Sequence, residues 1–272
     1  MAPATGAVMA GPQIGQAPEC GLRDAAAAAC EAKALRQAES ALAAARQGAA
    51  QAIAAPDERF ESDERKEWRS AFDATMTLWL RFRDARCDKR LIGYEMAGTA
   101  APAFNDASAC TLAITRVIAE DVSFRYALGT AEHPRESATR ALVVVPNPAS
   151  DEEGPCADVD PGECDYCGAN RCWEKRLVLA DRDLNRAWAR ALQAIRERPG
   201  LPVDQRIDWI ARLRAAQRAW LAWRDAECAL EPWETPNRFA HSIYATLIAP
   251  CLEGETLARI SDLSASYRLG DR

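Results

Sequence analysis

The chain has 272 residues, enough for two domains that each bury a core. Its net charge at pH 7 is −6, from 34 basic and 40 acidic residues, whereas nucleic-acid-binding proteins normally carry a basic surface. That class of partner is therefore disfavoured. Alanine is abundant, aromatic residues make up 7%, and Ile, Val and Thr are sparse, a balance typical of helices rather than strands.

The N-terminal segment, residues 1–18, is rich in small residues and is expected to be disordered. It has no Lys or Arg and no long apolar run, so it lacks the pattern of a secretory signal peptide. No uninterrupted apolar stretch anywhere approaches the ~18 residues that a membrane-spanning helix needs.

Apolar residues recur at helical spacing through most of the chain. This pattern predicts helices over 21–55, which Pro56 ends, over 62–94, and over 108–128 after a loop at 98–106. Later helices are expected over 170–198 and 204–230, with a turn at 199–202 between them. A loop at 232–237 and two helical pieces on either side of Pro250 complete the expected order.

Between these two sets of helices, residues 129–163 form an expected linker that is rich in proline. Acidic residues cluster at its end and no basic residue interrupts them. The simplest interpretation is a solvated spacer that repels itself. The functional alternative is a polyanionic patch for a cationic partner, formed by Asp151, Glu152, Glu153, Asp158, Asp160, Glu163 and Asp165.

Two nonapeptides, WLRFRDARC at 79–87 and WLAWRDAEC at 220–228, are nearly identical and lie 141 positions apart. The same offset pairs Trp68 with Trp209, Cys110 with Cys251, Thr115 with Thr256 and Tyr126 with Tyr267. Upstream the offset becomes 142 and pairs Cys30 with Cys172. A register held over about a hundred residues indicates a tandem duplication. We therefore expect one helical module at 19–128 and a second at 164–272.

Ten cysteines require an explanation, and three of them recur at matched positions in each module. A zinc site was considered, because Cys164 and Cys167 form a C-x-x-C pair, but neither His133 nor His241 lies near it. Thioredoxin-like chemistry lacks a surrounding βαβ pattern. Structural disulfides are the favoured interpretation, for Cys20, Cys30, Cys87, Cys110, Cys156, Cys164, Cys167, Cys172, Cys228 and Cys251.

Disulfides imply export, so we expect a periplasmic or secreted protein. The leader would have been removed or would lie partly upstream of the start, and a lipid anchor on it stays open. If the first two helices of each module form an antiparallel hairpin, Cys30 faces Cys87 and Cys172 faces Cys228. Cys110 would then pair with Cys20, and Cys251 with Cys164 or Cys167. Cys156 takes whichever of those two remains.

The repeated nonapeptide places Trp220 and Arg224 on one helix face, as it does Trp79 and Arg83. We expect the tryptophan to pack between helices, with the guanidinium hydrogen-bonded across the seam. A catalytic role would need more than this motif, which has no nucleophile, adjacent histidine or metal-ligand cluster. We expect a structural clasp between helices, no enzymatic activity, no cofactor and no metal.

The segment AQRAWLAWRDAEC at 216–228 closely resembles the signature of the lysozyme inhibitor LprI N-terminal-domain family, whose members are small, exported, all-helical bacterial modules. ADRDLN at 180–185, with Asp181 and Asn185, and Cys172 nine residues before that Asp support the resemblance. It covers module 2 well and module 1 more faintly, although CTLAITR at 110–116 is typical. The resemblance makes Trp79, Arg83, Asp84, Trp220, Arg224 and Asp225 family-motif residues with a structural role. It implies an all-α fold of two tandem repeats, each a disulfide-stapled helical hairpin plus a third helix.

Two functions remain open. The first, implied by the family, is inhibition of lysozyme-type muramidases, which are often strongly cationic and carry paired carboxylates in a cleft. An acidic protein is attracted to such an enzyme, with the acids of the linker as candidate partner-binding residues. The alternative is an envelope scaffold or ligand-binding helical module without inhibitory activity. The sequence predicts neither the oligomeric state nor the orientation of the modules.

Overall fold

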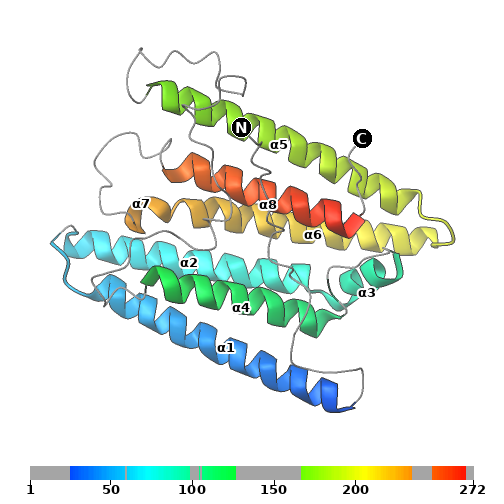
Figure 1. Ribbon diagram of the computed structural model, residues 1–272, viewed down its shortest axis with the longest axis horizontal. Helices are drawn as coiled ribbons and strands as arrows, with labels where there is room; N and C mark the ends of the chain where they lie inside the picture. Colours follow the sequence, from blue (N-terminus) through cyan, green and yellow to red (C-terminus); the bar gives the residue numbers. More distant parts are fainter. Residues whose placement is uncertain are drawn as a thin grey trace, which may run out of the picture.

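The computed structural model describes residues 25–58, 60–98, 104, 106–126, 167–234 and 247–267; the side chains of residues 25–28 and 167–170 are not among the described parts. Within these residues it consists of eight helices and contains no strand (Figure 1). The helices are α1 (Ala25–Ala54), α2 (Ser62–Arg86), α3 (Lys89–Gly98), α4 (Ala107–Tyr126), α5 (Cys167–Arg196), α6 (Val203–Cys228), α7 (Glu231–Glu234) and α8 (Ala249–Tyr267). The predicted all-α fold class is confirmed.

The helices form two halves, α1–α4 and α5–α8, whose long members stack side by side (Figure 1). Across the stack the order is α1, α4, α2, α6, α8 and α5. Since α5, α8 and α6 are the repeat equivalents of α1, α4 and α2, the two halves have the same order when each is followed from its outer edge to the centre. None of the described helices is long and apolar enough to cross a membrane. The expected N-terminal segment 1–18 and the linker 129–163 lie outside the described residues.

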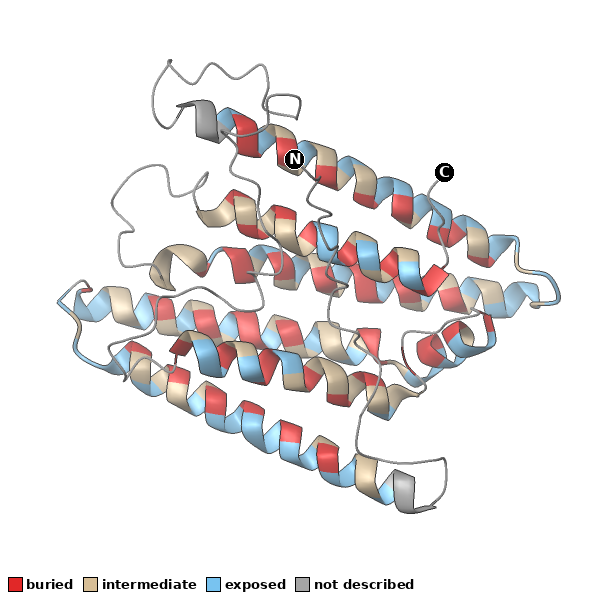
Figure 2. Ribbon diagram, in the orientation of Figure 1, coloured by how far each residue is buried: buried red, intermediate tan, exposed pale blue. Residues whose placement is uncertain are grey.

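The main helix pairs are α1 with α4, α5 with α8, and α2 with α6. The first and second helices of each module, which were expected to form a hairpin, also contact each other, but less extensively. Alanines explain the first pairing, because Ala38, Ala45 and Ala49 line the buried stripe of α1 and present little bulk to α4 (Figure 2). Four buried tryptophans, Trp68, Trp79, Trp209 and Trp220, lie on α2 and α6, which pack on each other at the centre.

One helix ends well before its predicted end. α2 stops at Arg86 rather than near residue 94, because the carboxylate of Asp88 accepts hydrogen bonds of 3.0 Å from the backbone N–H groups of Arg90 and Leu91. A side chain that satisfies the first N–H groups of a helix starts a new helix there, here α3. In the second half α6 ends at Cys228, and α7 occupies part of the segment predicted as a loop at 232–237.

The helical piece predicted before Pro250 lies largely outside the described residues, and the piece predicted after it is α8. Pro250 itself lies in the first turn of α8, after a π-type turn at 247–248. Proline is tolerated in a first turn because the N–H group that it lacks would have no partner inside the helix. The segment before residue 247 lies outside the described residues.

The predicted disulfide pairing is wrong. Cys87 bonds Cys110 and Cys228 bonds Cys251, each with 5.5 Å between the Cα atoms. α3 returns the chain so that the start of α4 lies beside the end of α2, and in the second half the start of α8 lies beside the end of α6. Cys30 and Cys172 are also disulfide-bonded, but not to Cys87 or Cys228. The predictions for Cys20, Cys156, Cys164 and Cys167 concern side chains outside the described part. Disulfides persist in oxidising compartments, which indicates an extracytoplasmic protein.

Candidate functional site

In the second half, the repeated motif joins three helices. The guanidinium of Arg224 lies over the Trp220 ring, 5.1 Å from its centroid, and Arg259 of α8 lies 5.9 Å from the same ring. Arg224 Nη1 donates to Thr256 Oγ1 of α8 at 3.0 Å and to Asp181 Oδ1 of α5 at 3.3 Å. Both the ring and the guanidinium are buried, so this part of the motif holds α5, α6 and α8 together.

In the first half the same motif makes fewer bonds. Arg83 lies 5.5 Å from the centroid of the buried Trp79 ring and donates to the adjacent Asp84. The buried Thr115 Oγ1, which is equivalent to Thr256, has no hydrogen-bond partner in the part of the chain that the structure describes. The position of Asp181 is taken by Glu39, which is exposed. The clasp is thus complete only in the second half.

The acidic and amide residues of the motif face solvent. The side chains of Asp84 and Asp225 are 68% and 62% exposed and bond their neighbouring arginines. Asn185 is exposed on α5, and Asp181 is half exposed. These groups do not converge on a pocket, so the geometry of the motif offers no arrangement for acid–base chemistry.

The contact between the halves is made by equivalent faces. Phe82 of α2 and Trp223 of α6 occupy matched repeat positions, and their rings stack on each other with centroids 5.7 Å apart and planes 8° apart. A residue that packs against its own equivalent lies at a two-fold axis, as in the isologous interface of a symmetric dimer. α2 and α6 are thus related as two subunits of a dimer would be, within one chain.

In each half a carboxylate accepts a hydrogen bond from a buried tyrosine of the other half. Tyr267 Oη donates to Glu95 Oε1 of α3 at 3.1 Å, and Tyr126 Oη donates to Glu234 Oε1 of α7. The two tyrosines are repeat equivalents, so the two bonds cross the interface in opposite directions. The pKa of each tyrosine lies well above its usual value, mainly because the hydroxyl is buried. The negative charge of Glu234 raises the pKa of Tyr126 further, and that of Glu95 raises the pKa of Tyr267.

Each tyrosine site contains a buried arginine. Arg86 Nη1 lies 2.9 Å from Glu95 Oε2, with side-chain exposures of 3% and 2%. At the other site Arg125 Nη1 lies 2.7 Å from Glu227 Oε1 and 3.3 Å from Glu234 Oε2. Burial alone would lower the pKa of Arg125, but the carboxylates of Glu227, Glu234 and Asp121 raise it well above its usual value. Both buried arginines are therefore paired with carboxylates inside the protein.

The pairing of these interface residues does not follow from the helical periodicity of the sequence. One signal was available: Arg86 and Glu227 occupy the same repeat position with opposite charges. A buried position that reverses its charge between two copies of a module indicates a site where the copies face different partners. Periodicity predicts that such a residue is buried, but not which helix covers it.

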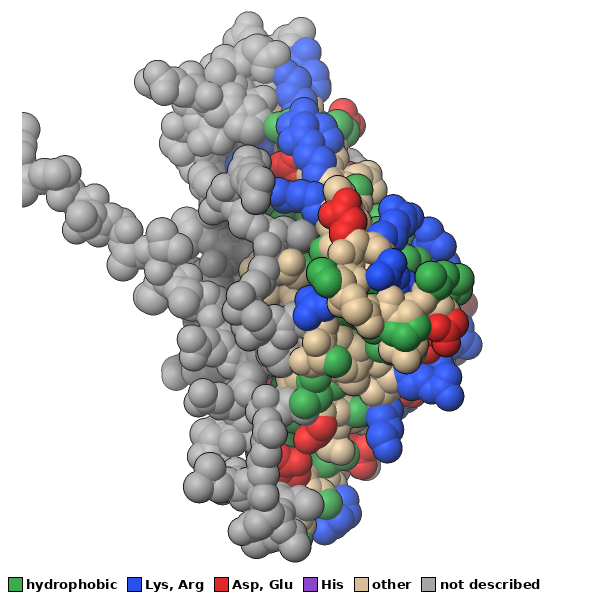
Figure 3. Space-filling model, turned by 90° about the vertical axis from the view of Figure 1, so that its right-hand side faces the viewer, with side chains coloured by type: hydrophobic (Ala, Val, Ile, Leu, Met, Phe, Trp, Pro, Cys, Tyr) green, Lys and Arg blue, Asp and Glu red, His purple; other side chains and the backbone are tan. Residues whose placement is uncertain are grey.

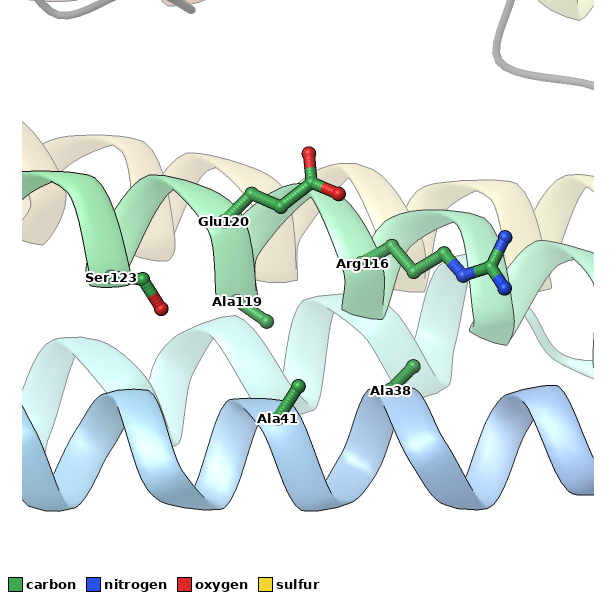
Figure 4. A pocket seen from close by; sticks show the side chains of 6 residues that line it. All are labelled: Ala38, Ala41, Arg116, Ala119, Glu120 and Ser123. Carbon is green, nitrogen blue, oxygen red and sulfur yellow. The ribbon is translucent and has the colours of Figure 1, made fainter.

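A pocket of about 310 Å³ lies between α1 and α4 and is lined by Ala38, Ala41, Arg116, Ala119, Glu120 and Ser123. Figure 4 shows the alanines pointing between the helices, while the charged ends of Arg116 and Glu120 point away from them. Ligand sites usually combine an apolar cavity with a few convergent polar groups. This pocket lacks the second feature.

Within the described residues, no group of three or more His, Cys, Asp or Glu side chains could hold a metal ion. Cys164, both histidines and the acidic cluster Asp151–Asp165 lie outside the described residues, and Cys167 begins α5 without a described side chain. The described part therefore contains a buried, internally bonded motif and an interface between halves.

The features described define an all-helical, disulfide-linked protein built from two copies of one module. Residues 21–120 and 160–263 match the family described as Lysozyme inhibitor LprI. The chain belongs to this family, and the two matched segments correspond to the tandem duplication. Neither the comparison with curated proteins nor that with solved structures found a match.

Proposed function

We propose that this protein is an extracytoplasmic inhibitor that binds a lysozyme-type muramidase and slows it. The observation that carries the proposal is the match of both halves to a family described as a lysozyme inhibitor. The disulfides agree with the compartment in which such enzymes act. We expect inhibition by protein–protein binding rather than by catalysis, because the motif of the family is occupied with holding helices together.

The buried positions of Trp79, Trp220 and Arg224 have a consequence for this proposal. Side chains that are buried against other helices are not available to a partner, so the repeated motif supports the inhibitor surface without forming it. The faces of α2 and α6 that pack on each other are likewise occupied. A muramidase would have to bind the outer surfaces or the segments between the helices.

Charge favours the segments between the helices. The eight helices together carry more basic than acidic residues, so the net charge of −6 comes from the rest of the chain. The densest acidic run there comprises Asp151, Glu152, Glu153, Asp158, Asp160, Glu163 and Asp165. We propose that this run attracts the cationic enzyme and raises the rate of association.

The test measures the association rate and the inhibition of a cationic lysozyme over a salt series. For the intact, oxidised protein we expect inhibition that weakens between roughly 50 and 500 mM salt, because the Debye length shrinks. Conversion of the seven linker acids to their amides should slow association. The control converts four exposed acids elsewhere, Glu67, Glu120, Glu174 and Glu197, which should change association less for each charge removed.

Equal association rates for the linker variant and the parent would show that the linker is only a spacer. If the intact protein inhibits no muramidase at low salt, the inhibitor proposal is wrong, and the envelope scaffold or ligand-binding module is the better description.

A further inference from the structure

Two aliphatic side chains stand out from one end of the protein. Val203 and Ile207, on the first two turns of α6, are 69% and 64% exposed. They are four residues apart, so they lie on the same face of the helix. Single exposed apolar residues are common on protein surfaces, but two neighbouring ones form an apolar patch. Such patches often mark a surface that binds something.

The fold itself does not require these two aliphatic residues. The equivalent positions at the start of α2 are occupied by Ser62 and Lys66, both exposed, and Lys66 Nζ forms an ion pair of 2.7 Å with Asp63. The first half therefore begins the same helix with polar residues. The apolar pair is a property of the second half alone.

Basic residues surround this pair. α3 packs on α6, with Tyr94 stacked on Trp209 at 5.7 Å between ring centroids, and begins with exposed Lys89 and Arg90. The Arg90 side chain is 71% exposed, and Arg196 is exposed at the end of α5. Figure 3 shows this end, where Lys and Arg side chains gather around hydrophobic ones. We call Lys89, Arg90, Arg196, Val203 and Ile207 the α3–α6 end.

The acidic residues near this end only partly offset its charge. Asp88 and Asp208 share Arg212, at 2.8 and 2.9 Å, so these three groups together carry a single negative charge. Glu197 and Asp204 are exposed and remain, against the three cations of the end and the further cations Arg198 and Arg206. The end is therefore net positive, in contrast to the chain as a whole.

We propose that the α3–α6 end binds the surface of a membrane that contains anionic phospholipids. Val203 and Ile207 would enter the boundary between headgroups and acyl chains, and Lys89, Arg90 and Arg196 would lie over the lipid phosphates. Aliphatic insertion beside basic residues is the combination that peripheral membrane binding requires. An anionic polymer in solution would use the cations and leave the aliphatic pair without a role. The proposal does not depend on muramidase inhibition.

The test is co-sedimentation of the full-length protein with vesicles of phosphatidylglycerol and phosphatidylcholine in equal parts, and with vesicles of phosphatidylcholine alone. We expect binding to the anionic vesicles that weakens with added salt. Val203→Ser with Ile207→Ser should lower the partition coefficient about tenfold or more, because two aliphatic groups no longer leave water. Lys89→Gln with Arg90→Gln should lower it about fivefold for each charge removed.

The matched control is Val178→Ser on α5, a residue that is 67% exposed but lies away from this end. It should bind as the parent does, and unchanged circular dichroism would show that all variants are folded. Three results would overturn the proposal: equal sedimentation of the parent with both vesicle types, parent-like binding by the Val203/Ile207 variant, or an equal loss in the Val178 variant. Parent-like binding of the aliphatic variant, with loss only in the charge variant, would indicate a purely electrostatic site for an anionic polymer.

Discussion

Arg86 and Glu95 have almost no exposure to solvent and lie 2.9 Å apart. A buried ion pair contributes little net stability over an apolar pair, but removal of one partner leaves an uncompensated charge in the interior. Asp262 Oδ1, 3.8 Å from Arg86 Nη2, is the other carboxylate near this arginine and belongs to the opposite half. Single substitutions at this site therefore affect both halves at once.

We expect Glu95→Ala to lower the free energy of unfolding by about 3 kcal/mol or more, because Arg86 loses its closest carboxylate. Urea unfolding measures the change. The control is Asp63→Ala, which removes an exposed pair with Lys66 and should change the free energy of unfolding far less. An equal cost for both variants would contradict the account of the buried site.

The two crossed tyrosines predict a loss of stability at high pH. Their pKa values are raised in the folded protein, so the folded state holds the proton more tightly than the unfolded state does. This stabilisation is fully present below the unfolded pKa of about 10 and is lost as the pH rises above it. Unfolding free energies measured across this range should fall for the parent protein, and Tyr126→Phe with Tyr267→Phe should flatten the decline. A decline as steep in the double variant would assign it to other groups.

At the scale of the elements, the disulfides Cys87–Cys110 and Cys228–Cys251 each tie the start of one helix to the end of another, over a sequence separation of 23 residues. Closure of such a loop restricts the unfolded chain. The two bridges stand at equivalent places in the two halves, so their contributions should be similar.

We expect Cys228→Ser with Cys251→Ser to lower the free energy of unfolding by about 3 kcal/mol, and Cys87→Ser with Cys110→Ser to do the same. Denaturant unfolding under non-reducing conditions gives both values. Peptide mapping of the parent should find Cys87 linked to Cys110 and Cys228 linked to Cys251. Peptides that join Cys30 to Cys87 would instead restore the hairpin pairing and contradict the structure.

The helices could be predicted from the sequence because their buried residues recur locally. Trp68, Phe72, Met76 and Trp79 of α2 follow the helical period, and all are buried. The partner of each buried face is decided by contacts far apart in the sequence, which periodicity does not contain. The assumed hairpin seam therefore gave the wrong disulfide pairing. The end of α2 was missed because its apolar pattern continues into α3, and only the bonds from Asp88 mark the break.

At the scale of the whole molecule, the sequence repeat predicted two copies of a module. It did not predict that the two copies pack against each other and bury each other's apolar residues. The stack of Phe82 on Trp223 and the crossed tyrosine bonds make α2 and α6 a shared centre. Leu230 and Trp223 of the second half pack into the core of the first, and Leu91 of the first packs into that of the second. Each half buries apolar surface that it would expose alone, so we expect the halves to unfold together.

The central claim, that two equivalent halves form one interlocked unit, is tested most directly by scanning calorimetry of the full-length oxidised protein. We predict a single transition whose calorimetric and van't Hoff enthalpies agree, as they do for one cooperative unit. Glu95→Ala should move this whole transition to lower temperature. Two separate transitions, or a variant scan in which only one part of the transition moves, would contradict the claim.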